Sequence, residues 1–260
     1  MRVLFIGDIV GKPGRTIAKK TIKFLRKKEK IDFVIANGEN AAGGSGLTPA
    51  ISEELFNSGI DLLTSGDHIW KKRDIYNFLK GTNNVLRPLN YPSGAPGTGS
   101  AVIEVNGGQY KIGVMNLIGR VFMEAVECPF RMAKEEVERL RKETPVIIVD
   151  IHAEATSEKA AMGWYLDGKV SAVVGTHTHI QTADEKILPG GTAYITDCGM
   201  AGPYDSVIGR KKEAVIERFL TQLPARFDMA VDNIEMHGVL IDIDERTGKA
   251  LAIKRVQEKL

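Results

Sequence analysis

The chain has 260 residues, of which 43% are hydrophobic and 26% are charged. These fractions are typical of globular proteins and exclude a disordered or a fibrous chain. Lys and Arg number 35 against 33 Asp and Glu, and the resulting formal net charge of +2 is too small for a surface that coats long nucleic acids.

The first third of the chain alternates short β-rich runs with helical segments. Thr48 is the expected start of the second helix. Strands separated by helices in units of about 30 residues indicate a parallel sheet with right-handed crossovers. The pattern predicts strands at residues 3–6, 33–36 and 62–64, and helices at 15–28, 49–57 and 73–79.

The pattern changes after Gly81. Residues 86–99 are rich in Pro and Gly, which favours a long loop beside the functional face. Strand-like runs at 101–105 and 110–116 flank Asn106-Gly107, whose tolerance of positive φ predicts a hairpin turn. The remaining pattern predicts helices at 131–142, 157–166 and 213–223, and strands at 146–151, 172–175, 192–196, 238–243 and 250–256.

These elements, with βα units first and hairpins later, favour an α/β fold of two packed sheets flanked by helices. No linker or internal repeat interrupts the sequence, so we expect a single domain over residues 1–260. No apolar run approaches the ~20 residues that a membrane span needs. Met1 leads directly into a strand-like run without a signal-peptide pattern, and we therefore expect a soluble, cytoplasmic protein.

Polar residues that can bind metal recur directly after the predicted strands. The carboxyl ends of strands in an open α/β sheet meet at one edge, so we expect these side chains to lie together there. Four of the five histidines fall at such positions; the fifth, His237, lies within the last strand region and is expected to be structural. The strand-end residues are Asp8, Glu39, Asn40, Asp67, His68, His152, His177 and His179.

The spacing of these residues indicates two adjacent metal ions. His177 and His179 lie on the same side of an extended segment, so each can serve one metal. Glu39 can bridge two cations from the middle of the set. Histidine nitrogen mixed with carboxylate oxygen suits Mn, Fe or Zn better than Ca or Mg.

Three other possible sites, namely two glycine-containing stretches and a cysteine nucleophile, are less well supported by the sequence. Residues 7–13 look like a phosphate loop, but the glycine spacing is too short and Pro13 follows Lys12 where Ser or Thr is needed. The glycine-rich residues 43–46 do not directly follow a strand and are interpreted as a loop near the metals. The two cysteines, Cys128 and Cys198, belong to no CxxC pair and are expected to be reduced; Cys198 could pair with a histidine, yet a buried thiol is expected there.

These residues resemble the motifs of the calcineurin-like metallophosphoesterase superfamily. The chain is more similar still to the YmdB-like branch, which has Gly-Glu-Asn in the second motif and a segment like residues 202–209 here. The matching stretches are Gly7-Asp8-Ile9-Val10-Gly11, Gly38-Glu39-Asn40, Gly66-Asp67-His68, Ile151-His152-Ala153 and Gly175-Thr176-His177-Thr178-His179.

The resemblance implies a four-layer αββα fold, a di-iron or di-manganese centre ahead of zinc, and phosphodiesterase activity on 2′,3′- and 3′,5′-cyclic nucleotides. It implies attack by a hydroxide that bridges the metals, with His68 as the proton donor to the leaving oxygen, and self-association as a homo-oligomer. It assigns one metal to Asp8, Glu39, Asn40 and His179, and the other to Glu39, Asp67, His152 and His177.

One residue departs from the family pattern, because Asp67 stands where the family has Asn. An anionic ligand holds a cation at least as tightly but makes it a weaker Lewis acid. Asp67 therefore leaves open a regulatory or RNA-associated binding protein with weak activity. A nucleotidase or a protein phosphatase also stays open, because the metal constellation does not encode the leaving group. Specificity is expected in the loops at 86–99 and 199–209, where Tyr204 either stacks on a base or caps the core.

Overall fold

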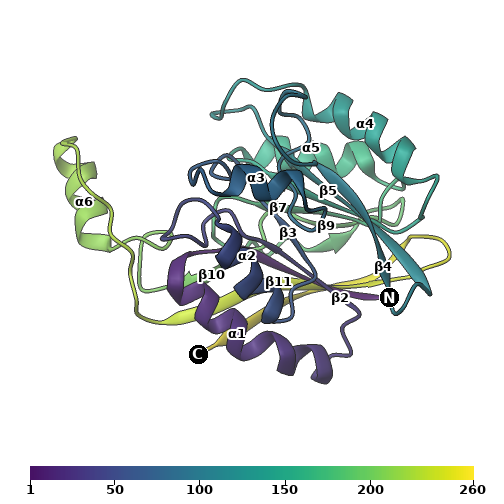
Figure 1. Cartoon of the computed structure of the whole chain (residues 1–260), viewed down its shortest axis with the longest axis horizontal. Helices are drawn as coiled ribbons and strands as arrows, with labels where there is room; N and C mark the ends of the chain where they lie inside the picture. The colour runs from purple at the N-terminus through teal and green to yellow at the C-terminus, as the bar shows by residue number, and fades with distance from the viewer.

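Two six-stranded sheets form the centre of the protein, whose computed structural model describes all 260 residues (Figure 1). In the first sheet, the four strands at residues 200–203, 2–9, 33–37 and 62–64 run parallel. Its order is β12 (Ala250–Lys259), β11 (Ile234–Ile243), β10 (Met200–Pro203), β1 (Arg2–Ile9), β2 (Phe33–Asn37) and β3 (Leu62–Thr64).

The second sheet is also mixed. Its four inner strands run parallel, and each of its two edge strands is antiparallel to its neighbour. The order is β4 (Ser100–Val105), β5 (Tyr110–Ile118), β6 (Ile147–His152), β7 (Ala172–Thr176), β9 (Ala193–Ile195) and β8 (Lys186–Ile187).

Helices cover the outer faces of the two sheets (Figure 1). The first and second helices pack on the first sheet, and the fourth and fifth pack on the second sheet. The sixth helix stands away from the sheets. The helices are α1 (Gly11–Lys28), α2 (Pro49–Asn57), α3 (Ile75–Lys80), α4 (Pro129–Leu140), α5 (Thr156–Leu166) and α6 (Lys212–Thr221).

Alternation along β1 shows why these layers form. Successive side chains of a strand point to opposite faces. Leu4 and Ile6 pack with Ile17 of α1, whereas Phe5 packs between the sheets with residues such as Val174 of β7. Each of these buried side chains stabilises the fold by about 1.5–3 kcal/mol. The result is the predicted α/β fold of two mixed sheets flanked by helices.

Two sequence-based boundaries need correction. The helix expected from residue 15 begins at Gly11. Pro13 falls in its first turn, where the missing N–H of proline leaves no hydrogen bond unmade, so this residue does not delay the start of the helix. The segment 199–209 is not all loop, because Met200–Pro203 pairs with β1 on one side and β11 on the other.

Other expectations agree with the structure. The turn between β4 and β5 is a hairpin in which Asn106, Gly107 and Gly108 all have positive φ. Thr48 caps α2 by accepting a hydrogen bond from the Ile51 backbone N–H at 3.3 Å. No helix in the protein combines the length and apolar character needed to cross a membrane.

Candidate metal centre

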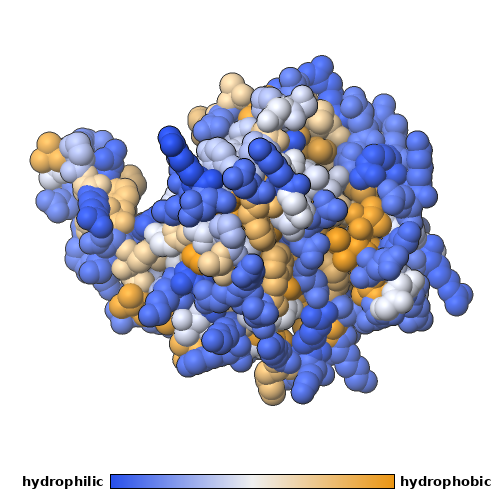
Figure 2. Space-filling view, in the orientation of Figure 1, coloured by the Kyte–Doolittle hydropathy of each residue, from blue (hydrophilic) through white to orange (hydrophobic).

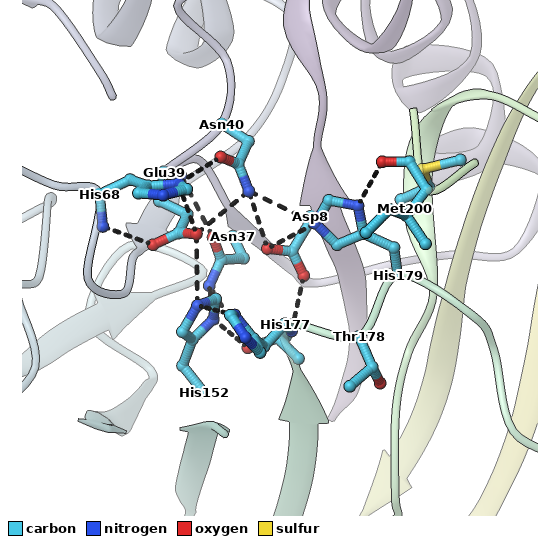
Figure 3. Close-up of polar contacts among 12 residues, drawn as sticks. Asp8, Asn37, Glu39, Asn40, His68, His152, His177, Thr178, His179 and Met200 are labelled. Carbon is cyan, nitrogen blue, oxygen red and sulfur yellow. Dashed lines mark hydrogen bonds and ion pairs between the residues drawn. The ribbon is translucent and has the colours of Figure 1, made fainter. Parts of the chain in front are cut away.

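The predicted site residues meet at one end of the sandwich, but they come from both sheets and not from one sheet edge. The first sheet supplies Asp8 in β1, Glu39 and Asn40 after β2, and Asp67 after β3. The second sheet supplies the last residue of β6, His152, and two residues after β7, His177 and His179. The site therefore lies where the carboxyl ends of two packed sheets converge (Figure 3).

Four of these residues form a tight group. One ligand atom each from Glu39, Asp67, His152 and His177 lies within 4.8 Å of all the others. His152 Nε2 is 3.2 Å from Glu39 Oε1 and 3.4 Å from Asp67 Oδ1. His177 Nδ1 is 3.0 Å from His152 Nε2. Two carboxylates and two imidazoles thus converge on one small space.

A second group lies beside the first and contains Asp8 and His179 (Figure 3). His179 Nε2 is 3.6 Å from Asp8 Oδ1. Asn40 Nδ2 lies 3.5 Å from Asp8 Oδ1, 3.1 Å from Glu39 Oε1 and 3.4 Å from His179 Nε2. The side chains of Glu39 and Asn40 therefore connect the two groups.

The outer nitrogens of His177 and His179 each face an oxygen. His179 Nδ1 lies 3.1 Å from the carbonyl oxygen of Ile208, and His177 Nε2 lies 3.1 Å from Glu154 Oε2. A carbonyl or carboxylate oxygen can only accept, so these nitrogens carry the hydrogen. In the neutral rings, the lone pairs then point into the site.

His152 is oriented by a buried relay. Its Nδ1 lies 2.9 Å from Thr176 Oγ1, and that hydroxyl donates its only hydrogen to Asp150 Oδ1 at 2.7 Å. Thr176 can therefore only accept from His152 Nδ1–H, which leaves Nε2 free to bind. Burial raises the pKa of Asp150 to about 7, so the accepting carboxylate form predominates above that pH.

The local geometry fits a bound cation. Asp67 Oδ1 is buried and accepts no hydrogen bond, which is uncommon for a buried carboxylate oxygen. His152 Nε2 and His177 Nδ1 lie only 3.0 Å apart, so two potential donor nitrogens for a metal border the same small space. A Cβ on Gly66 would lie 2.2 Å from the His152 ring and 2.3 Å from Glu39 Oε2, so only glycine leaves this space open.

Charged side chains within the site shift the pKa values of their neighbours. Burial alone would raise the pKa of Asp8, but the facing His179 and His152 lower it below the ordinary value. Burial alone would lower the pKa of His152, but Glu39 and Asp67 raise it well above the ordinary value. Protons therefore compensate the carboxylates when no cation does, and a bound cation would displace them.

The two histidines after β7 lie in a strained backbone segment. His177 has a φ of 97° and His179 a φ of 64°, a region that costs a non-glycine residue about 1–3 kcal/mol. Asp197 holds the residue between them by accepting from Thr178 N at 3.1 Å and Thr178 Oγ1 at 2.7 Å. Lys159 Nζ pairs with the same carboxylate at 2.8 Å, and both side chains are buried.

Sequence reasoning missed this ion pair. Asp197 follows β9 just as the other carboxylates follow their strands, and that pattern could have drawn attention to it. Lys159 lies inside α5, where a lysine normally faces solvent, so no sequence signal marks it.

His68 borders the site without joining the tight group. Its Nδ1 lies 2.8 Å from Asn40 Oδ1, and its backbone N–H donates to Glu39 Oε2 at 3.1 Å. Its Nε2 lies 3.5 Å from Asp67 Oδ2. His68 also lines a pocket of about 430 Å³ that opens beside the site.

The pocket holds one unpaired cation. Arg210 is half-buried on the pocket wall, and no carboxylate lies within 4.0 Å of it. Its Nη2 donates to the carbonyl oxygen of Gly44 at 2.6 Å, which brings the glycine-rich loop 43–46 to the site as expected. Burial lowers the pKa of the Arg210 guanidinium. An unpaired cation beside a pocket favours an anionic occupant.

The structure also bears on three further expectations, which concern Tyr204, the loops expected over the site and the two cysteines. Tyr204 donates to the Met200 carbonyl oxygen, and its ring lies 4.2 Å from that of His237, so it caps the core and does not face the pocket. No residue of 86–99 lines the pocket, whereas Ile208 does. Both cysteines are free, and burial raises the pKa of the Cys198 thiol, which disfavours a nucleophilic thiolate.

Comparisons with known proteins agree with this geometry. Residues 4–256 match the sequence profile of the YmdB-like protein family. The 2′,3′-cyclic-nucleotide 2′-phosphodiesterase of Bacillus subtilis is 51% identical over 98% of this chain and 96% of its own length.

Solved structures that resemble this chain include two close matches and one more distant one. A hypothetical protein from Thermus thermophilus has a TM-score of 0.93 and 40% identity, covering 100% of this chain and 99% of its own. A novel phosphatase from Mycoplasma pneumoniae has a TM-score of 0.93 and 36% identity, covering 100% and 93%. The 5′-nucleotidase of Candida albicans, at 12% identity and a TM-score of 0.55 over 99% of this chain and 51% of its own, shares the fold. The chain therefore belongs to the YmdB-like protein family and is a metal-dependent phosphoesterase.

Proposed function

We propose that the protein hydrolyses cyclic-nucleotide phosphodiesters, 2′,3′-cyclic ones in preference to 3′,5′-cyclic ones, at a centre of two metal ions. The observation that carries this proposal is the orientation of three histidines, whose outer nitrogens are held by oxygens and whose inner nitrogens face carboxylates. The name of the relative that is 51% identical supports the choice of substrate.

The ligands would divide between two ions, and Glu39 would contribute to both. Asp8, Glu39, Asn40 and His179 would hold one ion. Glu39, Asp67, His152 and His177 would hold the other, and these four already converge within 4.8 Å. Mixed nitrogen and carboxylate donors favour iron or manganese, ahead of zinc, over calcium or magnesium.

The chain's own residues complete the chemistry. When bound, the two ions supply Lewis acidity, which neutralises charge on the phosphate oxygens and acidifies water. His68 lies on the pocket wall beside Asn40 and donates a proton to the ribose oxygen that leaves phosphorus. Arg210, with no carboxylate partner, adds positive charge where the phosphodiester lies. The product is a nucleoside phosphate monoester.

An assay of metal-loaded protein tests the proposal. We expect turnover of 2′,3′-cyclic AMP to exceed that of 3′,5′-cyclic AMP, bis(p-nitrophenyl) phosphate and p-nitrophenyl phosphate. His68→Ala should lower the rate on the 2′,3′-cyclic substrate about 10²- to 10⁴-fold while metal content stays unchanged.

Other outcomes would point elsewhere. Hydrolysis of the monoester alone would indicate a phosphatase or nucleotidase. No turnover of any substrate by fully metal-loaded protein would favour a binding protein. Loss of metal in His68→Ala, or full activity, would contradict the role given to His68.

A further inference from the structure

The pocket beside the candidate metal centre has walls of two kinds. Its volume is about 430 Å³, which lies within the range of pockets that bind small molecules. One set of lining residues belongs to the metal site, and it includes Glu39 and His68. The other set is apolar and consists of Val10, Ile208 and Phe227. The proposed function uses the first set to hold and cleave the phosphodiester, and it leaves the apolar set without a task.

The apolar set is built around the turn at residues 207–210. Ile208 lies directly behind a proposed ligand, because its carbonyl oxygen is 3.1 Å from His179 Nδ1. Val10 packs against the same turn at Gly209, where a Cβ would lie 2.8 Å from Val10 Cγ1. Short contacts therefore fix this apolar wall to the metal site.

Phe227 is held in the wall by Arg210. Arg210 Nη1 donates to the Phe227 carbonyl oxygen at 3.3 Å, and Nη2 donates to that of Gly44 at 2.6 Å. Arg218 Cζ lies 6.0 Å from the centroid of the Phe227 ring, and Arg218 lines the neighbouring groove but not the pocket. The guanidinium thus steadies the ring from the side of the groove.

Phe227 stays accessible to a ligand. It leaves 36% of its surface exposed and lines the pocket. Figure 2 shows that the surface is hollowed between the projecting α6 and the body of the protein. An aromatic side chain with a fixed backbone and an open side can serve as a stacking platform.

A nucleotide has two parts that match these two walls. Its phosphate is anionic and suits the metal site and the guanidinium of Arg210. Its base presents a flat π-face, which aromatic side chains bind by stacking. Val10, Ile208 and Phe227 carry no hydrogen-bonding group in their side chains, so they can contact the face of a base but cannot read its edge. The apolar wall therefore suits any base, and a purine gains more contact than a pyrimidine.

We propose that Phe227, together with Ile208 and Val10, forms the subsite for the base of the cyclic nucleotide. The inference rests on the proposed function and adds which part of the substrate the pocket recognises beyond the phosphodiester. The base makes the same contact before and during attack on phosphorus, so this contact lowers KM and leaves kcat nearly unchanged.

Kinetics of the full, metal-loaded chain test the subsite with three substrates. They are 2′,3′-cyclic AMP, 2′,3′-cyclic UMP and methyl ribofuranoside 2,3-cyclic phosphate, which lacks a base. We expect the wild-type kcat/KM on 2′,3′-cyclic AMP to exceed that on the base-free substrate about 5- to 150-fold, the factor that one base–aromatic stack provides. The value for 2′,3′-cyclic UMP should lie between them.

Variants of Phe227 separate stacking from a structural role. Phe227→Ala should bring the ratio between 2′,3′-cyclic AMP and the base-free substrate close to one, by raising KM for 2′,3′-cyclic AMP. Phe227→Tyr keeps the ring and should keep the wild-type ratio. Phe219→Ala is a matched control, since Phe219 is a 75% exposed aromatic residue of α6 that lines the groove but not the pocket. Circular dichroism should show the wild-type fold in all three variants.

Two kinetic results would overturn the subsite. One is a wild-type protein with equal kcat/KM on 2′,3′-cyclic AMP and on the base-free substrate. The other is a Phe227→Ala variant that keeps the wild-type ratio, even if it is slower on every substrate, because Phe227 would then only support the wall.

Failure of the proposed function is a different result, namely no turnover of any of the three substrates by the wild-type protein. Calorimetric titration with adenosine 3′-monophosphate and with inorganic phosphate then decides on the subsite. Phe227→Ala should weaken binding of the nucleotide about 5- to 150-fold and leave that of inorganic phosphate unchanged. Equal affinity of the wild-type protein and Phe227→Ala for the nucleotide would rule the subsite out.

Discussion

At the scale of single residues, the decisive feature is which nitrogen of each histidine faces the site. Glu154, Ile208 and Thr176 each fix one ring by occupying its outer nitrogen. A hydrogen-bonded structural histidine differs: His237 pairs with Glu235 through Nε2 and leaves a buried Nδ1 without a partner. Orientation of the ring therefore separates a metal ligand from a packed histidine.

Replacing Thr176 tests this orientation. Thr176→Val keeps the shape of the side chain but removes the hydroxyl that accepts from His152 Nδ1. We expect metal affinity to fall about 10- to 100-fold, as is typical when an outer partner of a ligand is lost. Titration with Mn²⁺ measures the change, and Thr176→Ser, which keeps the hydroxyl, should bind close to the wild-type value. Equal affinity of the two variants would contradict the relay.

At the scale of elements, α5 holds the segment that follows β7. Lys159 extends from α5 to Asp197, and Asp197 holds Thr178 between the two histidines. The strain of two positive φ values is thus opposed by a buried ion pair. A helix that contributes no residue to the tight group still determines where two of the predicted ligands lie.

Breaking this ion pair should be costly. Lys159→Met leaves Asp197 buried without a counter-charge, and we expect the metal-free protein to lose about 3–5 kcal/mol of unfolding free energy. Urea unfolding measures this loss. Lys169→Met, at an exposed position just after α5, should change the unfolding free energy by less than about 0.5 kcal/mol. A similarly small change in both variants would show that the pair carries little stability.

How well the sequence predicts a helix or strand depends on whether that element forms by itself or only by pairing with distant strands. Most strands are apolar runs with clear ends. The polar residues at those ends, Asp8, Glu39 and His152, could therefore be predicted as site residues directly from the sequence. β10 could not, because Met200–Pro203 includes Gly and Pro and is a strand only through pairing with β1 and β11. The last helix was expected at 213–223 but ends at Thr221, because Gln222 adopts a φ of 59°, which a right-handed helix cannot continue.

At the scale of the whole molecule, the proposed ligands join the two sheets. Asp8, Glu39 and Asp67 belong to the first sheet, whereas His152 and His177 belong to the second. The sequence predicted that the site residues follow strands and meet at one edge of a sheet. It could not show that these strands belong to two sheets, because the sheet that a strand joins depends on its pairing with distant strands. A cation at this position would tie the carboxyl ends of both sheets together.

Metal removal should therefore lower the melting temperature. A ligand at 100 times its Kd stabilises the native state by about 2.7 kcal/mol, which corresponds to roughly 5–10 °C for a chain of this size. Calorimetry of metal-loaded protein with and without a chelator measures the shift. His152→Ala, which removes a ligand of one of the two ions, should show a smaller shift than the wild-type protein. Identical melting of the wild-type protein with and without chelator would argue against a metal that bridges the sheets.

The position of β1 in the first sheet also affects how the chain folds during its synthesis. β1 is translated before every other strand of its sheet, yet one of its sides pairs with β10 and β11, which are translated much later. During synthesis that side of β1 remains an open, apolar strand edge until the C-terminal third leaves the ribosome. Open edges of this kind pair with other chains. A chain stopped before β11 is therefore a candidate for aggregation and for chaperone binding, even though every predicted metal ligand is already present in it.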